Sequence, residues 1–299
     1  MTGSTPVVRT VRGDVPATEL GVVDSHDHLF IRSPQLPGKE LDDVREAGAR
    51  LAAFRDLGGG TVIQWTPHGM GRKADQLPTL SERLGVHVVA ATGMHQAAHY
   101  FPESLAALRG SLAGLFVREI TEGIHGSGVR AGLIKVAGGF HGLDEHARLT
   151  MRAAAKAHRR TGAAIAVHLE LGTGALDVLD LLCGELEVAP DRVILGHLNR
   201  SPDFTAHRQA AEAGAYLAFD GPSRANHATD WRMPDAIGAL ADAGHADRLL
   251  LGGDTVTPDT PGMPHLLRRV RPRLELTLGK ELVERILIGN PPGAFGLRR

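Results

Sequence analysis

The feature that most constrains the fold is an alternation that repeats eight times along the chain. A short apolar or β-branched run, typical of a buried strand, is followed by a longer segment whose apolar residues have helical spacing. Strands that alternate with helices form parallel sheets, since each return to the same edge needs a crossover connection. Eight units predict a closed (β/α)8 TIM barrel, with strands at residues 21–24, 61–65, 86–92, 131–136, 163–168, 192–197, 215–220 and 248–254.

The segments between these runs complete the expected architecture. Helices are predicted at residues 41–57, 76–84, 111–124, 145–160, 174–183, 203–213 and 234–243. Residues 7–11 alternate like a strand and Gly13-Asp14 can turn the chain, so a short N-terminal β-hairpin is expected before the barrel. No linker interrupts the 299 residues, and a single barrel domain over residues 1–299 is predicted.

Composition narrows the class of partner. Lys and Arg total 33 against 34 Asp and Glu, so no global charge attracts nucleic acid or an anionic membrane, and a small-molecule substrate is expected. Cys183 is the single cysteine, which excludes an internal disulfide and a Cys-based zinc site. The start of the chain has no signal-peptide pattern and no apolar run approaches the ~18 residues of a membrane span, so a cytoplasmic protein is expected.

Metal-type side chains stand where the predicted strands end. In (β/α)8 barrels the chemistry lies at the C-terminal ends of the strands, and the two histidines of His26-Asp27-His28 would point to the same side there. Other predicted strands end in His168, His197 and Asp254. Four imidazoles and one carboxylate suit zinc or a similar divalent ion, but they are too many for one catalytic site that keeps a position open. The sequence therefore favours two metals held by His26, His28, Lys135, His168, His197 and Asp254.

Lys135 has a specific chemical purpose in this hypothesis. Two catalytic metals ~3.5–4 Å apart need a bridging anion, and no carboxylate ends strands four to six. A lysine buried near cations has a lowered pKa, so its neutral amine can react with carbon dioxide. We expect Lys135 to become a carbamate that bridges both ions.

An ordered set of motifs resembles the phosphotriesterase family of the amidohydrolase superfamily, including its phosphotriesterase-like lactonases and related proteins. The resemblance covers about residues 8–297. It rests on residues 10–16, 19–21, 24–30, Gly69-Met70-Gly71-Arg72, 91–93, 131–137, 194–197, 214–216, 219–220 and Asn290-Pro291.

The resemblance implies a role for each ligand. His26, His28 and Asp254 would hold the more buried metal, His168 and His197 the more exposed one, and carboxylated Lys135 both. A hydroxide bridging the ions would be the nucleophile, with Asp254 accepting and returning a proton. The metal could be zinc, manganese, cobalt or iron, with zinc preferred, and a homodimer is expected from the family.

Departures from the organophosphate-degrading members point to another substrate. Leu198-Asn199-Arg200 replaces the acidic residues after their strand-six histidine, and Gly221 replaces a histidine after their strand-seven aspartate. The resemblance therefore implies hydrolysis of a lactone or carboxylic ester, with phosphotriesterase activity as a side reaction. Arg200 and Arg224 would face the pocket mouth and favour an anionic substrate such as a phosphorylated sugar lactone, although Thr255 follows Asp254 where that subgroup has a basic residue.

Other substrate contacts and functions remain open from sequence. His95, His99 and Tyr100 follow the third strand and Trp231 the seventh, so His95, Tyr100 and Trp231 are candidate contacts. Asp220 is expected to accept a hydrogen bond from a metal ligand. The same metals would serve an amide (N-acyl) hydrolase or a phosphotriesterase, and a barrel without activity would be a ligand-binding protein.

Overall fold

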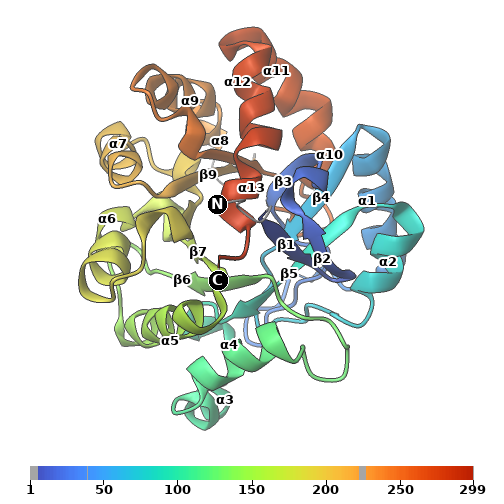
Figure 1. Ribbon diagram of the computed structural model, residues 1–299, viewed down its shortest axis with the longest axis vertical. Coiled ribbons are helices and arrows are strands. Elements are labelled where there is room, and N and C mark those ends of the chain that lie inside the picture. The colour runs from blue at the N-terminus through green and yellow to red at the C-terminus, as the bar shows by residue number, and fades with distance from the viewer. Residues whose placement is uncertain (1–5, 39, 222–226, 299) are drawn as a thin grey trace, which may run out of the picture.

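The computed structural model describes residues 6–38, 40–221 and 227–298 and confirms the barrel. Within these ranges eight parallel strands form one sheet in chain order, and helices surround it (Figure 1). The Asp254 N–H donates to the His26 carbonyl at 2.9 Å and brings the last strand beside the first. The strands are β3 Val22–Asp27, β4 Gly59–Gln64, β5 His87–Gly93, β6 Leu133–Ala137, β7 Ala164–His168, β8 Val193–Gly196, β9 Tyr216–Asp220 and β10 Leu249–Gly252.

The helices follow the predicted order, with several short additions. Those near the predicted segments are α1 Val44–Asp56, α2 Leu77–Leu84, α4 Leu112–Thr121, α5 Glu145–Thr161, α6 Ala175–Leu179, α7 Phe204–Glu212 and α9 Met233–Asp242. Not expected were α3 Pro102–Leu108, α8 His227–Asp230, α10 Gly262–His265, α11 Arg271–Leu278, α12 Lys280–Glu284 and α13 Pro291–Phe295. No helix in the described part of the chain combines the length and apolar character needed to cross a membrane.

Local sequence explains where the longer helices begin and end. The carboxylates of Asp43, Asp144 and Asp203 accept hydrogen bonds from free N–H groups in the first turns of α1, α5 and α7. Gly162 ends α5 with a left-handed φ of 72°, a backbone conformation that residues with a side chain rarely adopt. These caps fix the lengths of the helices that cover the sheet.

Two apolar layers hold the barrel. One lies between the helices and the sheet, and the other fills the barrel interior with residues such as Ile63, Leu133 and Ile194. The interior layer continues into the predicted hairpin, β1 Val7–Thr10 with β2 Gly13–Pro16, and into α13, so the first and last described elements lie near the barrel axis (Figure 1). Packing therefore closes the N-terminal end of the barrel, and the C-terminal ends of the strands carry the polar residues.

Candidate active site

A cavity of about 340 Å³ opens at the C-terminal ends of the strands. It lies where the barrel interior stops being apolar, and five strands contribute polar side chains to its wall. The structure brings all six predicted ligands to this one cavity, namely His26, His28, Lys135, His168, His197 and Asp254.

His26 and His28 present the same kind of nitrogen to Asp254. Their Nε2 atoms lie 3.6 and 3.8 Å from Asp254 Oδ1. His26 Nδ1 donates to the Asp220 carboxylate at 3.0 Å. His28 Nδ1 donates to Thr66 Oγ1 at 2.7 Å, since that hydroxyl gives its own proton to a carbonyl. Both rings are thus held with an unprotonated Nε2 facing one carboxylate oxygen, which fits a divalent cation.

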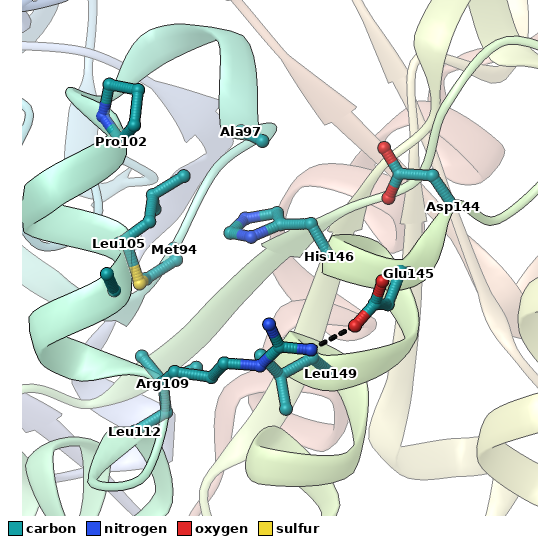
Figure 2. Close-up of a pocket in the computed structure, with 11 residues that line it drawn as sticks. Met94, Ala97, Pro102, Leu105, Arg109, Leu112, Asp144, Glu145, His146 and Leu149 are labelled. Carbon is teal, nitrogen blue, oxygen red and sulfur yellow. Dashed lines mark hydrogen bonds and ion pairs between the residues drawn. The ribbon is translucent and has the colours of Figure 1, made fainter.

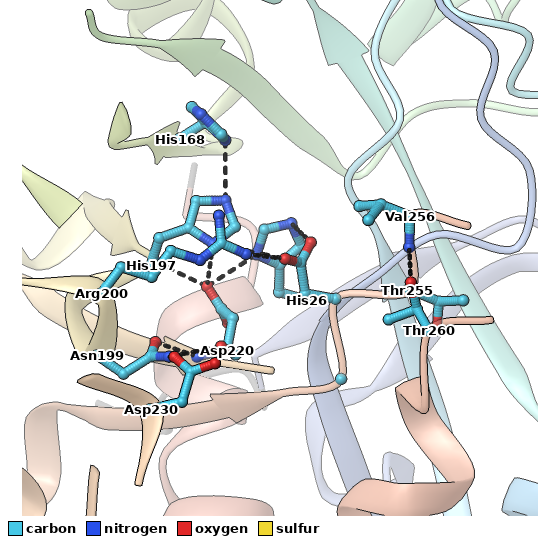
Figure 3. A network of polar contacts seen from close by, with 12 residues as sticks. His26, His168, His197, Asn199, Arg200, Asp220, Asp230, Thr255, Val256 and Thr260 are labelled. Atoms are coloured by element: carbon cyan, nitrogen blue, oxygen red, sulfur yellow. Dashed lines mark hydrogen bonds and ion pairs between the residues drawn. The ribbon is translucent and has the colours of Figure 1, made fainter. Parts of the chain in front are cut away.

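His168 and His197 form a second pair on the cavity wall. His168 Nδ1 lies 2.8 Å from His197 Nε2 (Figure 3). His168 Nε2 lies 3.1 Å from the Glu170 carboxylate. His197 Nδ1 is buried and has no hydrogen bond within the described residues, although Asp220 Oδ2 is 3.3 Å away. Two imidazoles whose ring nitrogens meet on the wall of one cavity are suitable ligands for a second cation.

Asp220 supports the ligands from behind. With His26 and His197 it also has the spacing of a metal site. However, its Oδ2 already accepts the His26 Nδ1 proton and the His197 backbone N–H, the latter at 2.7 Å, on the side of His197 away from His168 (Figure 3). We therefore assign Asp220 the orienting role expected from its position.

Burial and charge set the protonation of this cluster. Burial lowers the pKa of His28 and His197 well below the ordinary value, so both are neutral at pH 7. Burial also lowers the pKa of Lys135 to about 7. Burial would raise the pKa of Asp254, but the Arg200 guanidinium and the His26 and His28 rings outweigh it and lower the pKa to about 2. Neutral imidazoles and an ionised carboxylate are the forms that bind metals.

Two of the candidate ligands have strained backbones. His197 has a φ of 66° and Asp254 a φ of 48°, in the left-handed region that residues other than glycine rarely adopt. Such conformations cost about 1–3 kcal/mol each and cluster at functional sites. At the residues that follow β8 and β10, the direction of the side chain is therefore set at the expense of a favourable backbone conformation.

Sequence reasoning missed a buried carboxyl pair beneath the cavity. Asp24 Oδ1 accepts the N–H groups of His26 and Gly253, each at 3.1 Å, and Asp27 Oδ1 accepts that of Thr255 at 3.0 Å. Both are fully buried, and burial raises the pKa of each. The pair joins the end of β3 to the loop that carries Asp254. Its signal was present in Asp24-Ser25-His26-Asp27, but the partner loop is more than 220 residues away.

The predicted substrate contacts differ in position. Arg200 and His95 line the cavity, and an Arg200 Nη2 atom contacts Asp254 Oδ2. His95 Nδ1 is buried without a hydrogen-bond partner in the described ranges, and the carbonyl of this residue accepts the His146 Nε2 proton at 2.8 Å. Arg224 lies outside the described residues.

Tyr100 and Trp231 do not line this cavity. The Tyr100 hydroxyl accepts the His95 N–H at 2.9 Å and donates to the His68 carbonyl at 3.0 Å, so it holds the loop after β5. Trp231 is 66% exposed and lines a separate depression between α9 and α11. Trp65 packs its indole on the His26 ring, with 3.7 Å between ring centroids.

We expect Tyr100→Phe to act mainly on stability. The change leaves a buried N–H and a carbonyl without their shared partner, which costs about 1–3 kcal/mol. Urea unfolding of the variant and the wild type measures this loss. A stability equal to the wild type, together with a large change in KM, would show instead that the hydroxyl binds substrate.

A larger cavity of about 420 Å³ lies on the other side of the loop after β5 (Figure 2). Its lining is mostly apolar, with Met94, Leu105 and Leu149, and an Arg109–Glu145 ion pair lies at its rim. None of the residue groups with metal spacing in the described chain lies there. Size alone therefore does not locate the chemistry.

The barrel and the buried His and Asp clusters together define a class, a (β/α)8-barrel hydrolase with a site suited to metal. The model of the phosphotriesterase family matches residues 6–295, and the chain belongs to this family. A phospho-furanose lactonase of Mycoplasmopsis synoviae is 31% identical over 95% of this chain and 90% of its own length. A lactonase structure from Listeria monocytogenes aligns with a TM-score of 0.91 at 26% identity, covering 98% of this chain and 100% of that one. An N-acetyltaurine hydrolase of Mus musculus is 25% identical over 95% of this chain and 96% of its own length.

Proposed function

We propose that this hydrolase uses two divalent metals to open a lactone or carboxylic ester, and that its substrate is anionic, with a phosphorylated sugar lactone as the preferred class. The observation that carries the proposal is the Arg200 guanidinium, which shares one cavity with the six candidate ligands. A cation bound by Asp254 would compete with Arg200 for that carboxylate and leave the guanidinium facing the substrate. The relation to a phospho-furanose lactonase supports the same substrate class.

The residues of the cavity would have separate roles in hydrolysis. His26, His28 and Asp254 would hold one metal, His168 and His197 the other, and carboxylated Lys135 both. Zinc or a similar pair of cations would polarise the carbonyl oxygen and lower the pKa of a water molecule. Asp254 would accept a proton from the attacking water and return it to the leaving alkoxide. Arg200 would bind the anionic group and orient the ring, and the free Nδ1 of His95 would hydrogen-bond to the substrate.

Amide hydrolysis is the second candidate. The relation to an N-acetyltaurine hydrolase favours it, because N-acetyltaurine carries a sulfonate, an anionic group that a guanidinium can bind. The metals do not choose the leaving group, so the pocket alone separates the two reactions.

Metal analysis combined with a substrate panel tests the proposal. The panel contains γ-lactones, phosphorylated sugar lactones, N-acyl amino acids, N-acyl aminosulfonates and an aryl phosphotriester. About two metals per chain with fastest turnover of a phosphorylated lactone is the expected result. Faster cleavage of N-acyl substrates would favour the amidase, whereas a folded protein that binds no metal and turns over nothing would overturn the hydrolase mechanism.

Arg200→Gln tests the anionic substrate. We expect kcat/KM to fall by about 10–100-fold for a phosphorylated lactone, since a charge-assisted hydrogen bond is worth about 1.5–3 kcal/mol. For a neutral lactone of the same ring size the fall should be smaller. Arg208→Gln, on the exposed face of α7, is the matched control. An equal fall for both lactones would mean that Arg200 acts only through Asp254.

A further inference from the structure

Glu170 is a carboxylate on the cavity wall that the ligand set does not include. It lies two residues after His168, in the loop that follows β7. Its Oε2 accepts a hydrogen bond from Gln96 Nε2 at 3.0 Å, in addition to its contact with the His168 ring at 3.1 Å. Gln96 Nε2 also donates to the Gly138 carbonyl at 2.9 Å. Glu170 and Gln96 together thereby connect the loops after β5, β6 and β7.

This contact determines which ring nitrogen of His168 carries the proton. An ionised carboxylate can only accept, so His168 Nε2 must be the donor and Nδ1 is left with a lone pair. That lone pair faces His197 Nε2, 2.8 Å away on the cavity side. His168 is the last residue of β7 and is partly exposed, and without such a partner its ring could rotate and present either nitrogen.

Two of the other histidines in the cluster, His26 and His28, have partners on the ring nitrogen that faces away from the cavity. Asp220 holds His26 and Thr66 holds His28, both through Nδ1. Glu170 holds His168 through the opposite nitrogen, Nε2. The site therefore needs a different supporting residue here, because the ligand atom on this ring is Nδ1.

We propose that Glu170 is a positioning residue that, braced by Gln96, fixes the His168 ring so that Nδ1 faces the second metal. The inference rests on the proposed function, since it concerns a ligand of the proposed dinuclear site. Loss of a partner behind a metal-binding histidine typically costs about 10–100-fold in metal affinity. The loss should fall on the metal held by His168 and His197 and leave the one held by His26 and His28.

Metal titration of matched variants tests this assignment. Zinc is titrated into metal-free wild type, Glu170→Ala, Glu170→Gln and Gln96→Ala in competition with a chelator, and Glu185→Ala on the exposed surface serves as the control. We expect the weaker of two zinc sites to lose about 10–100-fold in affinity in Glu170→Ala, and less in Gln96→Ala. Glu170→Gln should recover most of the loss, because its amide oxygen can still accept the Nε2 proton.

A second readout follows the ring itself without any metal. Nitrogen-15 NMR of labelled histidine distinguishes the two tautomers, and His168 should change from the Nε2–H form to a mixture in Glu170→Ala but not in Glu185→Ala. Unchanged zinc affinities and an unchanged tautomer would overturn the inference. A Glu170→Gln variant as weak as Glu170→Ala would also overturn it, because Glu170 would then act as a charged ligand. Wild type that binds no zinc would instead refute the proposed function.

Discussion

Lys135→Ala is expected to reduce bound metal from about two ions per chain to one or none, and to lower lactone turnover by at least about 10³-fold. Loss of a bridging ligand removes several kcal/mol of transition-state stabilisation, and each 1.4 kcal/mol is tenfold in rate. Lys135 is the one lysine among the described residues that line the cavity. Its pKa of about 7 leaves a large fraction of neutral amine at physiological pH, the form that reacts with carbon dioxide.

Elemental analysis and a lactone assay check this result. Lys156→Ala removes an exposed lysine from α5 and should leave both unchanged. Reconstitution of metal-free wild type with zinc and bicarbonate should be more complete at pH 8 than at pH 6, because the neutral fraction of an amine with a pKa near 7 rises from about a tenth to about nine-tenths. A Lys135→Ala protein that keeps two metals and full turnover would rule out the carbamate.

Asp254→Asn is expected to lower kcat/KM by at least about 10³-fold with the fold retained. The carboxylate combines three roles, because it faces both the His26 and His28 nitrogens, contacts Arg200, and is the candidate proton acceptor. An amide of the same shape keeps the packing but loses the negative charge that a cation and a proton need. The strained backbone at this residue is also unchanged by the substitution.

Steady-state kinetics and circular dichroism measure the two parts of that expectation. Asp259→Asn, in the exposed part of the same loop, is the control and should behave as wild type. If Asp254→Asn retained more than about a tenth of the wild-type kcat/KM, the assignment of Asp254 as both ligand and proton acceptor would be wrong.

The barrel was predictable because its strands and helices differ in the period of their apolar residues. The predicted strands overlap the observed ones, although β3 extends to Asp27, three residues beyond the predicted end, because apolar residues give way to buried polar ones there. Most of the helices that were not expected are short, and two of them, α3 with seven residues and α13 with five, begin with proline. Segments of two turns or fewer have too few apolar positions to show a helical period.

The candidate ligands were predictable for a different reason. His168, His197 and Asp254 stand at or just after strand ends, and a barrel brings all such ends together. The residues that orient the candidate ligands were harder to predict from sequence, because Thr66 and Glu170 are identified only by the histidine ring that each one contacts. Tyr100 and Trp231 lie on loops, whose direction a strand–helix pattern does not specify. That pattern therefore predicts which side chains share the barrel mouth, but not how the loops above it are folded.

The left-handed backbone at His197 and Asp254 has an evolutionary consequence. Glycine at either position would relieve backbone strain worth about 1 kcal/mol, so the local backbone conformation favours replacement of these two candidate ligands. A copy of this chain freed from selection for catalysis should accumulate replacements there earlier than at an unstrained ligand such as His26. The pair would then serve as an indicator, across related sequences, of which barrels still perform chemistry.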